Sequence, residues 1–306
     1  MPNEITLEPR EVKLTTRTNT VVRRTLPHKE LKMIGAWCFI DHYGPTKTVD
    51  AMSVAAHPHT GLQTVSWLFS GEIEHHDSVG SSQLIHPGQL NLMTSGYGIA
   101  HSELSLDVGQ ELHGVQLWVA LPASQKDIAP HFEHHNDLPK FEYEGLQITL
   151  MMGEMNGHKS SAITYSPLIG AEITGHANKV SIPLNPQFEY GILVDRGTLL
   201  INGNLVKSAN LHYLPAGSEN LLIESNEYFR AMLIGGAPFD EEIIMWWNFI
   251  GRTHEEIVKM REDWESKSPR FASFEDRIGD RIPAPNMPSL KLKPRGRIVE
   301  PKLGEF

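Results

Sequence analysis

The feature that most constrains the fold of this 306-residue chain is a series of short apolar runs between Val21 and Val119, separated by glycine-containing turns. Runs of this length at regular spacing are typical of β-strands in a sandwich or barrel. No helical periodicity accompanies them, so we expect an all-β fold in this half of the chain. The runs are Trp37 to Ile40, Thr64 to Phe69, Ser82 to Ile85, Gln89 to Met93 and Val115 to Val119.

The same pattern returns after residue 145, which indicates two copies of one barrel fold. Apolar runs again alternate with turn residues, and Asn202-Gly203-Asn204 is a good hairpin signal. The stretch from Leu121 to Tyr143 is polar and contains proline, so we interpret it as an irregular, exposed linker. We therefore predict a first barrel over residues 1–135 and a second over residues 136–250.

A helix is expected only near the end of the chain. Thr253 has the character of an N-cap, Glu256 follows at the third position, and apolar residues then recur on one face up to Ser266. From Arg281 to Lys302 the sequence is rich in proline, arginine and lysine, which predicts a tail that lies extended on the surface or stays mobile. Helix and tail make up the expected third segment, residues 251–306.

Charge and cysteine content narrow the class of function. The formal net charge of −10 argues against direct nucleic-acid binding, which requires a basic surface. Cys38 is the single cysteine, so no internal disulfide can form and a reducing compartment is expected. Residues 1–10 lack the apolar segment of a signal peptide, and no window approaches the ~18 apolar residues of a membrane span. These features predict a cytoplasmic protein without membrane contact.

Four residues predict a metal site: His57 and His59, and the pair His101 and Glu103. Side chains at i and i+2 leave the same face of a strand, so each pair can direct two ligand atoms at one point. Three imidazoles and one carboxylate suit Fe(II), Mn(II), Co(II), Ni(II), Cu(II) or Zn(II), and leave positions open for substrate or dioxygen. The alternative is that they are ordinary histidines in a chain that has 16 of them.

The remaining histidines give weaker predictions. His131, His134 and His135 could form a second cluster, but an irregular linker offers no matched geometry for a metal. His75, His76, Asp77 and His113 could support metal-binding imidazoles by hydrogen bonding. Because His75 and His76 are consecutive on an expected strand, only one of these two can face a pocket. His42 is interpreted as structural. His176 and His212 are isolated, so the second barrel is expected to lack a metal.

The chain carries the motifs His57-Pro-His-Thr-Gly to Gly71, His76-Asp-Ser, Pro87-Gly88, Met93 to Glu103, Phe39 to Pro45, His113-Gly-Val-Gln-Leu-Trp118 and Phe249 to Ile257. These motifs cover most of the chain up to about residue 270 and resemble the pirin family of the cupin superfamily. The resemblance implies a bicupin of two stacked β-barrels of the jelly-roll type, with one metal, usually iron, held in the first barrel by His57, His59, His101 and Glu103. As in pirins, the glutamate that ordinary cupins carry after the first histidine pair is replaced, here by Gln63.

Two functions follow from this resemblance. The first is a quercetin 2,3-dioxygenase, in which Glu103 accepts the hydroxyl proton of a flavonol while the metal polarises the oxygen. Phe39, Trp67 or Trp118 would line the mouth of its aromatic pocket, unless they belong to the barrel core. The second is a metal-dependent, redox-sensing regulatory protein that acts through a protein partner. A purely structural metal is disfavoured because such sites are usually closed and rich in cysteine.

Overall fold

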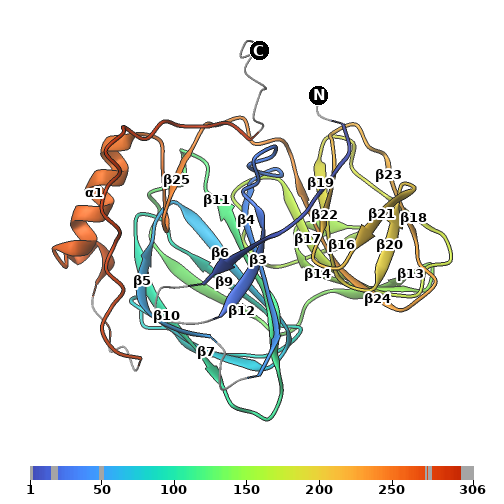
Figure 1. Cartoon of the computed structure of the whole chain (residues 1–306), viewed down its shortest axis with the longest axis horizontal. Helices are drawn as coiled ribbons and strands as arrows, with labels where there is room; N and C mark the ends of the chain where they lie inside the picture. Colours follow the sequence, from blue (N-terminus) through green and yellow to red (C-terminus); the bar gives the residue numbers. More distant parts are fainter. Residues whose placement is uncertain (1–2, 15–19, 48–51, 273, 275–277, 298–306) are drawn as a thin grey trace.

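The chain folds into two β-barrels that lie side by side, with a helix against the outer side of the first (Figure 1). The structure is a computed structural model that describes residues 3–14, 20–47, 52–272, 274 and 278–297. Strands dominate both halves, and one α-helix lies near the C-terminus of the described chain. The predicted all-β class and the two-barrel organisation are confirmed.

The first barrel consists of a seven-stranded and a four-stranded sheet, both antiparallel. The larger sheet has the strand order β12-β9-β6-β11-β4-β3-β2, and the smaller has β5-β10-β7-β8. Their bounds are β2 Arg10–Lys13, β3 Val21–Leu26, β4 Trp37–Thr46, β5 Ser53–His59, β6 Leu62–Ser70, β7 Glu72–Asp77, β8 Ser82–Ile85, β9 Leu90–Thr94, β10 Ile99–Leu106, β11 Leu112–Ala120 and β12 His131–His135.

The second barrel repeats this arrangement, with orders β1-β22-β19-β24-β17-β14-β13 and β18-β23-β20-β21. Two short pairs, β15 with β16 and β25 with β26, lie outside these sheets. The bounds are β1 Ile5–Leu7, β13 Lys140–Tyr143, β14 Leu146–Met152, β15 Glu154–Met155, β16 His158–Lys159, β17 Leu168–Gly175, β18 Val180–Pro183, β19 Glu189–Arg196, β20 Thr198–Ile201, β21 Asn204–Lys207, β22 Leu211–Leu214, β23 Asn220–Glu224, β24 Phe229–Gly236, β25 Ile244–Trp246 and β26 Phe249–Gly251.

Local sequence explains the tight β20–β21 hairpin that was predicted at Asn202-Gly203. Both loop residues have positive φ, 48° at Asn202 and 80° at Gly203, which is the conformation of a type I′ turn. The register then pairs Ile201 with Asn204. Asparagine and glycine tolerate this backbone better than other residues, so the dipeptide fixes the turn and the register together.

The prediction of an irregular linker from Leu121 to Tyr143 is wrong. This stretch contains two strands: β12 pairs with β9 at an edge of the first barrel, and β13 pairs with β14 at an edge of the second. β12 shows no alternation of buried and exposed residues, because all five of its residues are half-buried. A strand of that kind lacks the period-2 pattern by which strands are recognised in sequence.

The barrels are joined by exchanged elements and by a shared core. β1, near the N-terminus, pairs with β22 of the second barrel. Trp37 is fully buried and donates its indole N–H to the Gly235 carbonyl across the interface, at 3.1 Å. The division into residues 1–135, 136–250 and 251–306 stays a prediction, to which the topology adds the exchange of β1.

The C-terminal helix and tail lie against the first barrel. α1 spans His254–Glu265, and Thr253 caps it by accepting a hydrogen bond from the Glu256 backbone N–H at 3.2 Å, as predicted. A 3-10 helix, η2, follows at Pro269–Phe271. The tail then runs extended over the surface as far as residue 297, and its last predicted residues, 298–302, lie outside the described part. Among the described residues, no helix has the length and apolarity required to cross a membrane.

Candidate metal centre

The inner face of the four-stranded sheet of the first barrel holds the predicted metal ligands. β10 lies between β5 and β7, and the register places His101 opposite His57 on β5. The register shifts between His101 and Glu103, where a bulge or irregularity interrupts the ladder with β5. Such a feature can re-aim a side chain. All four predicted ligands are buried, with at most 8% of their surface exposed.

The structure brings the three histidines together around one point. The ligand atoms of His57, His59 and His101 all lie within 4.8 Å of one another. The ring centroids of His57 and His101 are 4.3 Å apart, and those of His59 and His101 are 5.0 Å apart. Glu103 joins a second group of the same kind that overlaps with the first, because it shares His101 and adds His75. The four predicted residues thus line one continuous site.

The hydrogen bonds of the rings favour a metal. His57 Nδ1 lies 2.9 Å from the Ala55 carbonyl oxygen, an acceptor, so Nδ1 carries the proton and Nε2 carries the lone pair. His59 Nδ1 and His101 Nε2 are buried and have no hydrogen-bond partner within the described part of the chain. Buried ring nitrogens without partners are costly, and a bound cation would satisfy them. The residues present therefore fit a divalent transition metal.

The protonation states point the same way. Burial lowers the pKa of His59 and of His101 well below the ordinary value, and the nearby His57 lowers both further. Both imidazoles are therefore neutral at pH 7, which is the form that binds metals. Burial raises the pKa of Glu103, although Ser66 Oγ lies 3.4 Å from its Oε1 and His75 lies nearby. A cation at this point would favour the ionised form of Glu103.

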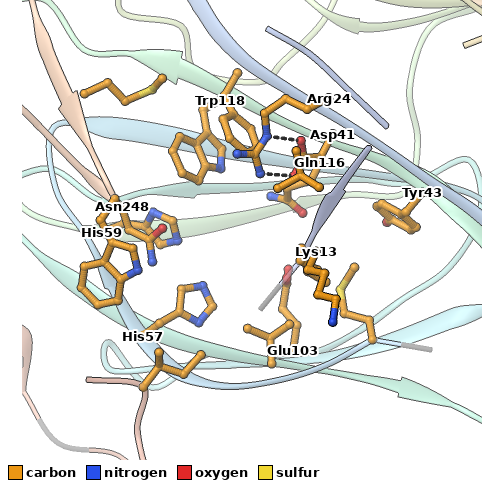
Figure 2. Close-up of a pocket in the computed structure, with 18 of the residues that line it drawn as sticks. Lys13, Arg24, Asp41, Tyr43, His57, His59, Glu103, Gln116, Trp118 and Asn248 are labelled. Carbon is orange, nitrogen blue, oxygen red and sulfur yellow. Dashed lines mark hydrogen bonds and ion pairs between the residues drawn. The ribbon is translucent and has the colours of Figure 1, made fainter. Parts of the chain in front are cut away.

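A pocket of about 590 Å³ opens over these residues (Figure 2). His57, His59, His101 and Glu103 all line it. Phe39 and Trp118 form part of its wall and stack with ring centroids 4.0 Å apart and planes 13° from parallel. A volume of this order is typical of small-molecule sites, and a stacked aromatic wall suits a flat ligand.

Two of the three aromatic residues expected at the pocket mouth are found there. Phe39 and Trp118 line the pocket and also pack in the hydrophobic core, whereas Trp67 is a core residue outside the pocket lining. The indole N–H of Trp67 donates to Glu172 of the second barrel at 2.8 Å, so this residue connects the barrels. Its apolar strand context in β6 is shared by pocket and core residues, and the sequence therefore does not separate the two roles.

Part of the pocket wall was not predicted as part of the site. Trp247 and Asn248 lie in the turn between β25 and β26, and the tail contributes Ile282 and Pro283. Lys13, at the end of β2, lines the pocket as well (Figure 2). These residues come from segments far apart in the chain, so only the folded structure places them at one site.

A second cluster of potential ligands lies at the contact between the barrels. His42 Nε2 and His113 Nε2 lie 2.8 Å and 2.7 Å from Asp195 Oδ1. Arg230 Nε donates to the other Asp195 oxygen at 2.6 Å, and an Arg23 nitrogen lies 3.3 Å from His42 Nε2. Because a cation here would face two guanidinium groups, we interpret the cluster as an ion-pair network. This agrees with the structural role expected for His42.

The other histidines are occupied elsewhere. His134 Nδ1 on β12 contacts Asn91 Oδ1 on the neighbouring β9 at 2.8 Å. His135 Nε2 contacts Glu133, also on β12, at 3.1 Å. His212 Nδ1 lies 2.9 Å from Thr6 Oγ1 on β1. His75 is buried and faces the site, whereas His76 on the next position is half-buried on the opposite face, as the strand alternation predicted.

Comparison with known proteins identifies the relatives of this chain. The family model described as Pirin matches residues 17–119, and the model described as Pirin C-terminal cupin domain matches residues 173–271. A Pseudomonas aeruginosa protein, provisionally named quercetin 2,3-dioxygenase, is 44% identical over 87% of this chain and 86% of its own length. A pirin-like protein of Caulobacter vibrioides is 34% identical over 87% of this chain and 95% of its own length.

A solved structure gives the same result in three dimensions. The crystal structure of quercetin 2,3-dioxygenase from Acinetobacter baumannii matches with a TM-score of 0.90 and 39% sequence identity. The match covers 94% of this chain and 97% of that one. Both barrels and their mutual arrangement are therefore shared with that protein.

Proposed function

This chain belongs to the pirin family, and on that premise we propose that it is a mononuclear metal dioxygenase that opens the ring of a flavonol such as quercetin. The observation that carries the proposal is the buried set of three neutral imidazoles beside Glu103, at the floor of a pocket with an aromatic wall. Relatives provisionally named for this activity support the choice of substrate.

We propose His57, His59, His101 and Glu103 as the residues that hold the ion, with Fe(II) as the first candidate. Mn(II), Co(II), Ni(II), Cu(II) and Zn(II) accept the same donor set. When bound, the metal would supply Lewis acidity toward a substrate oxygen and a centre for dioxygen chemistry. The ligand roles are proposed on the burial and orientation of the four side chains.

Glu103 is proposed as the residue that accepts the flavonol hydroxyl proton. Glu103 is buried and lines the pocket, so its carboxylate can accept a proton from a hydroxyl group that lies against it. The Ser66 hydroxyl lies 3.4 Å from Oε1, where it can hold that oxygen in place. Phe39 and Trp118 would contact the flat substrate from the pocket wall and orient its oxygens toward the histidines. Trp118 covers one face of the Phe39 ring and the Arg24 guanidinium covers the other, 4.2 Å from the centroid, so Phe39 would present its ring edge.

The proposed setting is the cytoplasm, and the proposed partner is a small aromatic molecule. Cys38, the only cysteine, is buried, and burial raises its pKa to about 12, so its thiol stays protonated and inert at neutral pH. The proposed function involves no direct binding of nucleic acid, and the net charge of −10 agrees with this.

The regulatory alternative requires a protein partner, and the following assay separates it from the enzyme.

The test is the aerobic oxidation of quercetin by protein that was loaded with Fe(II) under anaerobic conditions. We expect quercetin and dioxygen to be consumed in equal amounts, with release of one carbon monoxide for each quercetin. The measurement combines absorbance, an oxygen electrode and carbon monoxide capture. If none of the six metals supports turnover while the iron oxidation state changes binding of a partner protein, the regulatory alternative replaces the dioxygenase.

A further inference from the structure

A series of three buried side chains leads from the end of β7 to the site. His101 Nδ1 lies 3.4 Å from His75 Nδ1, and His75 Nε2 lies 3.1 Å from Asp77 Oδ2. The other oxygen of Asp77 accepts the backbone N–H groups of Val79 at 3.0 Å and Ser81 at 2.9 Å. Asp77, His75 and His101 are each at most 2% exposed. They are therefore held in fixed geometry.

The donor and acceptor of each hydrogen bond between Asp77, His75 and His101 can be derived from Asp77. Burial by itself raises the pKa of Asp77, but the hydrogen bonds from His75 and Ser81 outweigh it and lower the pKa below the ordinary value. An ionised carboxylate only accepts hydrogen bonds, so His75 must carry its proton on Nε2. With that single proton on Nε2, His75 presents a lone pair on Nδ1, and His101 must donate from its own Nδ1. A second proton on His75 would place a positive charge beside the proposed metal, which is unfavourable.

With its proton on Nδ1, His101 has its lone pair on Nε2, the buried nitrogen that has no partner among the described residues. We propose that Asp77 and His75 are positioning residues that fix the tautomer of His101 for metal binding. The inference rests on the proposed function and extends it beyond the four ligands. The Phe132 ring stacks on His75, with ring centroids 4.5 Å apart, and so holds the His75 side chain in place.

Substitution Asp77→Asn tests the proposal because the backbone selects the orientation of the new amide. The Val79 and Ser81 N–H groups require an acceptor, so the amide oxygen stays with them and the NH₂ group faces His75 Nε2. His75 must then accept on Nε2 and donate from Nδ1. His101 must accept on Nδ1 and carry its proton on Nε2, which removes the lone pair that a metal requires.

We expect Asp77→Asn to weaken Co(II) binding by about 10–100-fold, as measured by competition with a chromophoric chelator, and to reduce the intensity of the Co(II) absorption bands. The matched control is Glu74→Gln, on the opposite face of the same strand, which should leave the Co(II) affinity within about twofold of the wild type. Equal Co(II) affinity of Asp77→Asn and wild type would overturn the proposal, while one Co(II) per chain in both would leave the proposed metal site intact.

A second measurement requires no substitution. Long-range ¹H–¹⁵N NMR of the metal-free wild-type protein reports which nitrogen of each imidazole carries the proton. The proposal predicts a proton on Nδ1 of His101 and on Nε2 of His75. A proton on Nε2 of His101 would contradict it, whether or not Asp77→Asn folds and whether or not the protein oxidises quercetin.

Discussion

Replacement of His59 by alanine should abolish quercetin oxidation and reduce metal affinity by more than about 100-fold. Loss of a residue that only supports a metal ligand typically costs 10–100-fold, and loss of a ligand itself costs more. His59 is 2% exposed, and its ring centroid lies 5.0 Å from that of His101, so no other side chain can move into its place without repacking the sheet. Metal content after gel filtration and the rate of quercetin loss measure the effect.

The matched control is His176→Ala. His176 is an exposed histidine in the second barrel, and its ring contacts Tyr228 with centroids 5.6 Å apart. This variant should retain the metal and the full rate of quercetin oxidation. Turnover that is unchanged in His59→Ala, with wild-type metal content, would remove the proposed mechanism.

The second large effect concerns stability. We expect Asp195→Ala to lower the free energy of unfolding by about 3 kcal/mol, because it leaves a positively charged guanidinium, the buried His42 and the half-buried His113 without their shared acceptor. Asp195 has a fully buried side chain and contacts His42 and His113 across the barrel interface, as well as Arg230. Urea unfolding measures the change.

Asp240→Ala provides the control, because Asp240 is exposed and its removal should change stability by no more than about 0.5 kcal/mol. An equally small change in Asp195→Ala would show that the network does not join the barrels. In that case the contact would depend on the apolar core around Trp37 and on β1.

The pH dependence of this effect follows from Asp195. Burial by itself raises the pKa of Asp195, but the hydrogen bonds from His113 and His42 outweigh it and lower the pKa far below the ordinary value. A carboxyl group with a lowered folded-state pKa contributes stability above its unfolded pKa, about 3.9, and loses it as the pH falls further. The difference between wild type and Asp195→Ala should therefore persist from pH 7 to about 4 and shrink below that.

The sequence was sufficient to predict the barrels and the three-histidine cluster, because both depend on local periodicity. Side chains at i and i+2 on one strand share a face, so His57 and His59 had to converge, and the opposite strand brought in His101. Strand β12 was missed because its polar residues do not alternate in burial. The sequence indicated His75 only as one of several residues that could support the metal ligands. The structure shows that His75 lies beside His101, with 3.4 Å between their Nδ1 atoms.

Contacts between segments that lie far apart in the sequence could not be predicted from local sequence patterns. Asp195 meets His42 across 153 positions of sequence, and neither residue carries a local signal of the other. The pocket wall joins β4, the β25–β26 turn and the tail, so its shape depends on how the helix and tail pack against the first barrel. Such tertiary packing determines which aromatic residues face a ligand and which face the core.

The most direct test of the central claim is anomalous X-ray diffraction at the iron edge from crystals of the Fe(II)-loaded protein. The account predicts one anomalous peak per chain, about 2.0–2.3 Å from a nitrogen of each of His57, His59 and His101 and from an oxygen of Glu103. A peak between His42, His113 and Asp195 in place of this one, or no peak at the four residues in protein that contains iron, would contradict it.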